Sequence, residues 1–324
     1  MFSYIKELIN LVSKIGAFLV CFLFSFSSSS QQLSYSKERL AFSHQFNYAW
    51  KDSAGQEHKI AFEIPNSDLF KPFRSFKTFK AKHADNFVYL SIKKELRKKP
   101  IEGAQISFEK QQNEGTKVSI KTHSADVLKQ AQETLSALEN KYKQQYLDDN
   151  YYALFTTADG DMGVKPDHVR FANESVNHLK PIASVFAKKI NRRDARVIVN
   201  IVLSFVQSIP YSTLESRITS SGSGFNPPPS LLYQNQGDCD SKVTLMASIL
   251  KSILPRLDIV IIYIPNHALI GVQIPYKDNE EHIDINGIDY LLAEPTGPAI
   301  VPIGTIGDDS LQMIASGNFV AERF

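Results

Sequence analysis

Residues 239–293 contain one helical pattern followed by three short apolar strand patterns, and this order restricts the fold more than any other feature. Pro265 and Asn266 form a turn between the first two strand patterns, 259–264 and 267–272, and the third covers 289–293. Strands joined by short turns pair antiparallel, and a helix with one apolar face must cover such a sheet. We therefore predict an α+β fold. The apolar positions of the helical pattern are Val243, Met246, Ala247, Leu250, Ile253 and Leu254.

Composition limits the class of protein. The chain has 324 residues, of which 43% are hydrophobic and 22% charged, which is typical of one large or two smaller globular domains. A net charge of +2 gives no reason to expect a nucleic-acid partner. Of the two cysteines, Cys21 lies in an apolar N-terminal stretch, so the remainder holds only Cys239. One thiol excludes an intrachain disulfide framework there and argues against a thiolate zinc site, so we predict neither metal nor cofactor.

The N-terminal 30 residues predict the compartment. An apolar run at 15–26 is followed by four serines, which is typical of a secretory signal cleaved in the serine run. The run is short for a bilayer span, and a longer span would enclose Lys14, but an uncleaved anchor stays open as the alternative. We expect an exported, extracytoplasmic (periplasmic) protein, either soluble or held by this anchor.

The rest of the chain divides into three parts. Residues 33–123 predict a small β-rich module, because apolar residues alternate at 42–50 and 60–64, with a further strand expected at 86–92. A connecting helix capped by Ser124 covers 124–150, and the second domain covers 151–324. Helices are expected at 166–189 and 194–207. A loop at 220–229, rich in Ser, Gly and Pro, is expected to border a ligand cleft.

Cys239, His267 and Glu294 are the candidate reactive residues. Cys239 falls in the first turn of its helix, where free N–H groups favour a thiolate, whereas Asp238 and Asp240 oppose one unless they cap the helix or point to water. The net effect on the pKa of the thiol stays open. His267 begins one strand and Glu294 follows the next, and a thiol, an imidazole and a carboxylate in separate elements are typical of nucleophilic thiol catalysis.

Four segments carry a resemblance to a known family. They are Gly237-Asp238-Cys239-Asp240, Asn266-His267-Ala268, Leu292-Ala293-Glu294-Pro295-Thr296 and the preceding helix-and-tyrosine segment 205–211. Together they resemble the core of bacterial, exported transglutaminase-like (papain-related) cysteine enzymes, over about residues 165–310. The resemblance implies a papain-like core in which Cys239 is the nucleophile, His267 the base and Glu294 the orienting acid. It also implies acyl transfer through a thioester, on a protein or peptide substrate, with a peptidoglycan peptide and a small amide left open as well. Water or an amine resolves the thioester, and we favour water because it is always present and the sequence shows no acceptor site.

The sequence departs from this family in two places. Glu294 stands where the well-studied animal enzymes have Asp, and the only tryptophan is Trp50, so a tryptophan oxyanion donor beside the thiol is missing. The backbone N–H of Cys239 is one natural donor to an oxyanion. The candidates for the second donor are Gln234, Gln236 and Tyr211.

Further residues carry weaker signals. His282, in the polar stretch 277–286, is the rival base, although we expect it at an exposed hairpin tip. We expect His168 and His178 on the surface. A basic stretch interleaved with phenylalanines is expected to be a solvated face, and contact with an anionic envelope surface is the alternative if the chain is exported; no nucleic acid is expected. Such a surface would suit the alternative function, a catalytically silent transglutaminase-like binding protein of the envelope. The cations of this stretch are Lys71, Arg74, Lys77, Lys80 and Lys82.

Overall fold

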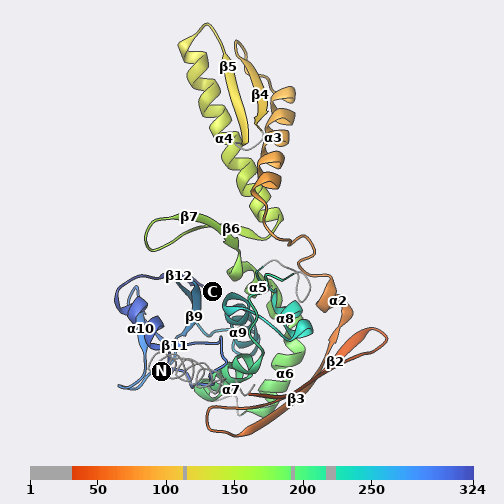
Figure 1. Ribbon diagram of the computed structural model, residues 1–324, viewed down its shortest axis with the longest axis vertical. Coiled ribbons are helices and arrows are strands. Elements are labelled where there is room, and N and C mark those ends of the chain that lie inside the picture. Colours follow the sequence, from red (N-terminus) through yellow and green to blue (C-terminus); the bar gives the residue numbers. More distant parts are fainter. Residues whose placement is uncertain (1–30, 112–114, 191–193, 217–223) are drawn as a thin grey trace, which may run out of the picture. The chain divides into compact units, whose positions relative to one another are not determined.

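The computed structural model describes residues 31–324, apart from 112–114, 191–193 and 217–223 (Figure 1). The predicted signal or anchor at 1–30 and part of the loop expected at 220–229 therefore lie outside the described residues. Within the described part, no helix is both long and apolar enough to cross a bilayer.

A five-stranded antiparallel sheet lies at the centre of the C-terminal half. Its order is β10-β11-β9-β8-β12, and each neighbouring pair runs antiparallel. The predicted hairpin between the first two strand patterns is confirmed, since Ile264 pairs with His267 across Pro265 and Asn266, and Asn266 takes the left-handed conformation that asparagine tolerates. The strands are β8 (Ile259–Ile264), β9 (His267–Val272), β10 (His282–Ile285), β11 (Ile288–Ala293) and β12 (Val320–Arg323).

Helix α9 (Cys239–Ile253) packs on one face of this sheet, which confirms the predicted α+β class. Its buried residues share one hydrophobic core with alternate residues of the strands, such as Ala268, Ile270 and Val272 of β9. The opposite face of the sheet packs in a second cluster with residues of α10 (Asp308–Ala315). The sheet therefore has helices on both faces.

The N-terminal strands complete the same core. Strands β1 (Gln32–Arg39), β2 (Ser43–Lys51) and β3 (Glu57–Pro65) form an antiparallel sheet, against which α6 (Lys180–Lys189) and α7 (Ala195–Ser208) lie (Figure 1). Trp50 is fully buried there, and its Nε1 donates to Ser204 Oγ of α7 at 3.0 Å. Residues 33–65 thus share a hydrophobic core with α7 and α9.

Residues 81–149 form two helices and a two-stranded hairpin. The strand predicted at 86–92 is wrong, because these residues lie in α3 (Ala81–Lys98), whose buried residues Val88 and Ile92 are spaced one turn apart. The connecting helix is confirmed as α4, and Ser124 Oγ accepts a hydrogen bond from Val127 N at 3.4 Å. The elements here are α3, β4 (Gln105–Gln111), β5 (Gly115–Lys121) and α4 (Ala125–Asp149).

The remaining elements surround the start of α9. The helix expected at 166–189 is divided at Leu179 into α5 and α6. The hairpin β6–β7 precedes α5, and α8 ends five residues before α9 begins. These elements are α2 (Asn66–Phe70), β6 (Tyr152–Thr156), β7 (Met162–Pro166), α5 (His168–His178) and α8 (Pro228–Gln234).

Candidate active site

Cys239 is the first residue of α9, and its position is fixed by the cap before it. The Asp238 side chain accepts from Ser241 N at 3.0 Å and also from the Ser241 hydroxyl. Ser241 Oγ in turn accepts from Asn226 N at 2.7 Å, which ties the chain entering α8 to the first turn of α9. Asp238 is therefore a helix cap, which is one of the two arrangements expected to weaken the rise in the thiol pKa that its charge causes.

His267 and Glu294 are paired. His267 Nε2 lies 2.5 Å from Glu294 Oε1, and the two side chains are 21% and 22% exposed. Ala293 of β11 pairs with Ile270 of β9, so the strand register brings the end of β11 back toward the start of β9, where His267 lies. A carboxylate can only accept, so Nε2 carries the proton and Nδ1 keeps the free lone pair of a base.

Glu294 is held as a carboxylate by several donors. The hydrogen bond to His267 lowers its pKa most, burial opposes this, and the Gly307 N–H, 2.8 Å from Oε2, lowers it further. The Ser310 hydroxyl adds another hydrogen bond from the first turn of α10. The backbone oxygen of Glu294 accepts from Gln207 Nε2 at 2.9 Å. Main chain and side chain are both fixed, so the longer side chain of Glu, compared with Asp, still reaches the imidazole.

The thiol of Cys239 lies beside the strand that begins with His267. The backbone N–H of Ala268, the next residue, forms a hydrogen bond to the sulfur that lowers the pKa of the thiol. Among the described residues, Sγ donates to Asp240 Oδ1 at 3.7 Å, and no hydrogen bond joins Sγ to His267. The three predicted residues thus meet at the N-terminus of α9 and the start of β9, with the thiol turned toward Asp240.

The resting thiol is protonated at neutral pH. Burial, then the charges of Asp240 and Asp238, raise the pKa of Cys239 to about 12, although the backbone N–H groups of Asp240 and Ala268 lower it. Burial and the two carboxylates therefore raise the pKa of the thiol by more than the free N–H groups at the start of the helix lower it. A reaction at this sulfur would therefore have to start from the thiol rather than from a preformed thiolate.

The three candidate oxyanion donors differ in placement. Tyr211 forms a parallel bridge with Gly237, and burial followed by the charges of Cys239, Asp238 and Asp240 raises the pKa of its phenol, so the side chain lies near the thiol. It is 51% exposed, which leaves it open to a ligand.

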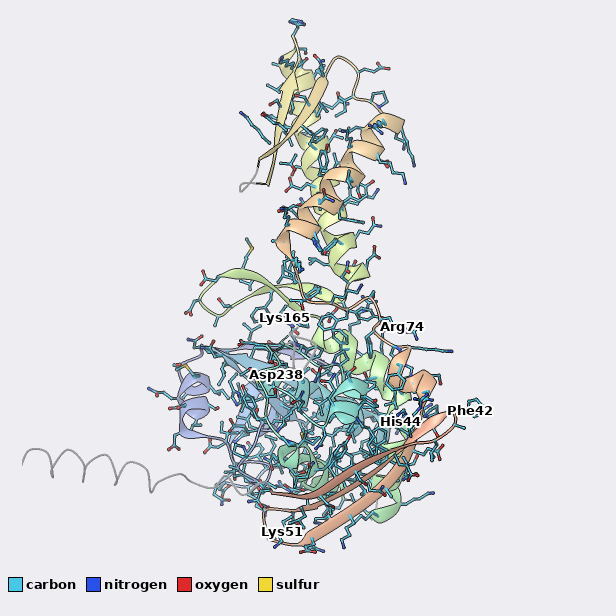
Figure 2. The ribbon with its side chains drawn as sticks, turned by 45° about the vertical axis from the view of Figure 1, so that its right-hand side comes forward. Phe42, His44, Lys51, Arg74, Lys165 and Asp238 are labelled. Atoms are coloured by element: carbon cyan, nitrogen blue, oxygen red, sulfur yellow. The ribbon has the colours of Figure 1, made fainter. Side chains whose placement is uncertain are left out.

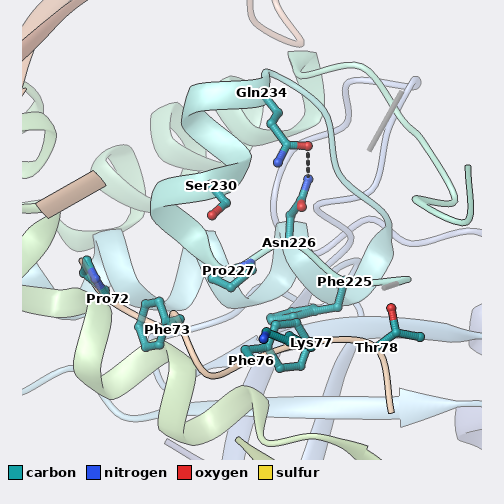
Figure 3. A pocket seen from close by; sticks show the side chains of 10 residues that line it. All are labelled: Pro72, Phe73, Phe76, Lys77, Thr78, Phe225, Asn226, Pro227, Ser230 and Gln234. Atoms are coloured by element: carbon teal, nitrogen blue, oxygen red, sulfur yellow. Dashed lines mark hydrogen bonds between the residues drawn. The ribbon is translucent and has the colours of Figure 1, made fainter. Parts of the chain in front are cut away.

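Gln234 and Gln236 lie instead around Asn226, whose Nδ2 donates to Gln234 Oε1 at 3.1 Å and to the backbone oxygen of Gln236 at 3.2 Å. Gln234 lines a cavity of about 230 Å³ between α8 and the segment before α3, and its amide points toward Asn226 (Figure 3). Phe73, Phe76 and Phe225 form the aromatic wall of this cavity. Of the three candidates, Tyr211 is the one that the structure places beside the thiol.

Two predictions about other histidines are wrong. His168 is not on the surface: it is 1% exposed, and its ring lies 4.9 Å from that of Phe225. His282 is exposed, as predicted, but it is not at a hairpin tip: it begins β10, where its ring stacks on Tyr276 at 3.7 Å. His178 is 29% exposed and pairs with Asp68 at 2.9 Å. The local pattern around His168 gave no sign of burial, because the residues that cover it come from distant elements.

Lys242 is a further residue of the site that sequence reasoning missed. Its side chain is fully buried, and Nζ donates to Ile209 O at 2.5 Å and to Thr296 O. These carbonyls follow α7 and β11, so one ammonium ties the thiol helix to the loop that carries Glu294. A lysine beside apolar residues of a buried helix is the signal that could have drawn attention to it, since lysine is almost never fully buried without a partner.

Gly297 offers a test of how tightly that loop is held. It has φ +68°, and a Cβ atom there would lie 2.4 Å from Gln207 O, whereas Gly287 has φ +81° with no neighbour within 4 Å. Gly287→Ala should therefore cost only the backbone strain of about 1–2 kcal/mol in the free energy of unfolding. Gly297→Ala should cost about 1–3 kcal/mol more, from overpacking. Urea denaturation of both variants measures this, and equal losses would mean that Gln207 yields freely.

Within the described residues, no cluster of three or more His, Cys, Asp or Glu side chains is arranged to hold a metal ion. No protein-family model matches the sequence, and neither a curated protein nor a solved structure matches it. The chemistry of this site therefore rests on the geometry of this chain alone: a partly buried thiol, an imidazole whose Nδ1 carries no proton, and a carboxylate that orients it.

Proposed function

We propose that this protein is a thiol-dependent acyl-transfer enzyme of the transglutaminase-like, papain-related kind. The observation that carries the proposal is the fixed His267–Glu294 pair at the strand end that contacts the thiol of Cys239. A carboxylate that orients an imidazole, which can then accept a thiol proton, is the arrangement that activates a cysteine nucleophile. The four resembling segments of the sequence support the same assignment.

The proposed reaction has two steps. His267 Nδ1 takes the proton of Cys239 as Sγ attacks a carboxamide or peptide carbonyl, and the C–N bond breaks while the amine leaves with that proton. A thioester remains on Cys239. Water then attacks the thioester with His267 as base, releasing the carboxylic acid and restoring the thiol. We propose the backbone N–H of Cys239 and the Tyr211 hydroxyl as the oxyanion donors. Hydrolysis is the favoured outcome, and an amine acceptor would give transamidation instead.

The test uses p-nitrophenyl acetate as a generic acyl donor for the full chain. We expect release of p-nitrophenol and an acetyl group on the Cys239 peptide, identified by mass spectrometry after acid quenching. Cys239→Ala should release no p-nitrophenol above the rate in buffer. Added glycine methyl ester separates the two outcomes, because a transamidase forms the acetylated amine and a hydrolase forms acetate. Absence of acetylated Cys239 in the wild-type chain would refute the proposal.

A catalytically silent binding protein is the second candidate, favoured by the exposed cations Lys71, Arg74, Lys77, Lys80 and Lys82. Figure 2 labels Arg74 beside α2. Most of the interleaved aromatics pack inward: Phe73 is buried, Phe76 packs on Phe171 and Phe79 packs on Tyr152, whereas Phe70 is 40% exposed. The surface is thus mainly cationic, which suits anionic lipid. If this candidate holds, Cys239→Ala keeps binding to anionic phospholipid vesicles, and reversal of the five charges abolishes it.

A further inference from the structure

A partly buried polar network reaches Asp240, the residue that accepts the thiol, and the proposed reaction does not use it. Lys165 of β7, labelled in Figure 2, donates to Glu322 Oε2 of β12 at 2.8 Å and contacts the Tyr263 hydroxyl of β8 at 3.3 Å. The Tyr263 hydroxyl donates to the same Glu322 oxygen at 3.1 Å and lies 3.0 Å from His168 Nδ1. The network therefore ends on His168, at the start of α5.

These contacts assign the tautomer of His168. With the single proton of the Tyr263 hydroxyl placed in its hydrogen bond to Glu322, the phenol oxygen accepts from His168 and Nδ1 carries a hydrogen. Burial, and then the charge of Lys165, lower the pKa of His168 well below its usual range, so the ring is neutral. Nε2 then presents a lone pair, and this fully buried atom has no hydrogen-bond partner among the described residues.

The group that faces this lone pair is Asp240. Its Oδ2 lies 3.7 Å from His168 Nε2, and its Oδ1 accepts the Cys239 thiol at 3.7 Å. A lone pair and a carboxylate oxygen repel each other unless a proton lies between them. The Asp240 side chain is 32% exposed, so this proton can exchange with water at the Asp240 end. Burial raises the pKa of Asp240, and a raised pKa favours a proton on its carboxyl group.

We propose that His168 and Asp240 form a second acid–base pair that shares one proton and sets the reactivity of Cys239 through the charge on Asp240. With the proton present, Asp240 is neutral and accepts the S–H group without opposing a thiolate. Without it, a carboxylate faces the sulfur and disfavours the thiolate. The inference deepens the proposed function, because it concerns the same nucleophile. Asp240 is here a positioning residue that acts through the sulfur.

Other charges act on Asp240 and enter the pH dependence. Lys165 and His267 lower its pKa, and Glu322 raises it. Asp238 and Tyr263 also lie within electrostatic reach, since the charge of Asp240 raises the pKa of each, and Tyr211 responds in the same way. One lysine, two imidazoles (His168 and His267) and two carboxylates (Asp238 and Glu322) thus act on Asp240, and Asp240 is the carboxylate whose oxygen contacts Sγ.

The first test is the rate of alkylation of Cys239 by iodoacetamide, from pH 6 to 11, in the full chain and in Asp240→Asn. Loss of a like charge beside the sulfur should lower the pKa of the thiol by at least about one unit, so the rate at pH 9 should rise at least about tenfold. Asp167→Asn is the matched control: Asp167 caps α5 one residue before His168, and asparagine caps equally well. Its profile should match that of the wild type within about twofold. A profile for Asp240→Asn within twofold of wild type would overturn the proposal.

The second test needs no change at Asp240. Ring nitrogen shifts of ¹⁵N-histidine-labelled full chain, with His168 assigned through His168→Gln, should show a proton on Nδ1 and an Nε2 that accepts a hydrogen bond. A proton resident on Nε2 with a bare Nδ1 would overturn the proposal. Iodoacetamide alkylation needs no general base, so these results stay readable even if the acyl-transfer function fails.

Discussion

Replacing His267 by alanine should slow acetylation of Cys239 by p-nitrophenyl acetate by about 10²- to 10⁴-fold at pH 7. The reason is the state of the thiol. Its pKa is raised to about 12 by burial, Asp240 and Asp238, so thiolate is scarce at neutral pH and attack depends on a base that removes the proton. The measurement is the rate of p-nitrophenol release in the full chain.

His282→Ala is the matched control for that variant. His282 is exposed in β10, where it stacks on Tyr276 and its Nδ1 lies 3.1 Å from Glu280 O, and no contact joins it to the three site residues in the described part of the chain. Its removal should leave the acetylation rate within about twofold of wild type. A larger effect from His282 than from His267 would exchange the two roles and contradict the assigned base.

Lys242→Ala should lower the free energy of unfolding by about 3–5 kcal/mol. The substitution removes the buried ammonium that donates to Ile209 O and Thr296 O, leaves both carbonyls without that donor, and takes away a cation that acts on Asp238. Lys251→Ala is the control on the same helix, because Lys251 also donates to a carbonyl, Leu257 O at 3.0 Å, but is only partly buried. It should cost less than about 1 kcal/mol. Similar losses in urea denaturation would show that burial of Lys242 is unimportant.

The free energy of unfolding should also depend on pH through the titration of Lys242 and of Asp238. Burial lowers the pKa of Lys242 from 10.5 to about 7, so between these values the unfolded chain binds the extra proton and stability rises with pH. Burial and Asp240 raise the pKa of Asp238 from 3.8 to about 7, so its contribution is fully present below pH 3.8 and is lost as pH rises through 7. The two groups together give least stability near pH 7. In Lys242→Met, the rise from pH 7 to 10 should be absent; an unchanged rise would refute this assignment.

The parts of the fold that the sequence predicted are those with strong local patterns. Helix α9 and strands β8, β9 and β11 each carry an apolar repeat of their own, and Pro265-Asn266 carries turn chemistry, so their positions follow from a few neighbouring residues. The strand prediction at 86–92 was wrong because the aromatic and β-branched residues there have a high strand propensity. The longer helical register, with Val88 and Ile92 buried one turn apart, prevails over that preference.

The candidate site likewise has residues that the sequence predicted and residues that it did not. The order of Cys239, His267 and Glu294 along successive elements was enough to predict that they meet, because an antiparallel sheet returns the chain to the same end. The groups that tune them were not predictable. His168 is covered by Tyr263 of β8 and by Phe225, which precedes α8, and Lys242 finds acceptors more than thirty residues away. Only packed tertiary structure brings such partners together, and no local pattern records it.

The proposed catalysis depends most on removal of the Cys239 proton by His267 during attack. The most direct measurement is the acetylation rate of Cys239 by p-nitrophenyl acetate as a function of pH, in the full chain and in His267→Ala. With an imidazole as base, the wild-type rate should level off below pH 9, well before the thiol itself titrates at about 12, and the plateau should be missing in His267→Ala. A wild-type rate that rises about tenfold per pH unit to above pH 10, identical in His267→Ala, would show attack by free thiolate alone and contradict the assigned base.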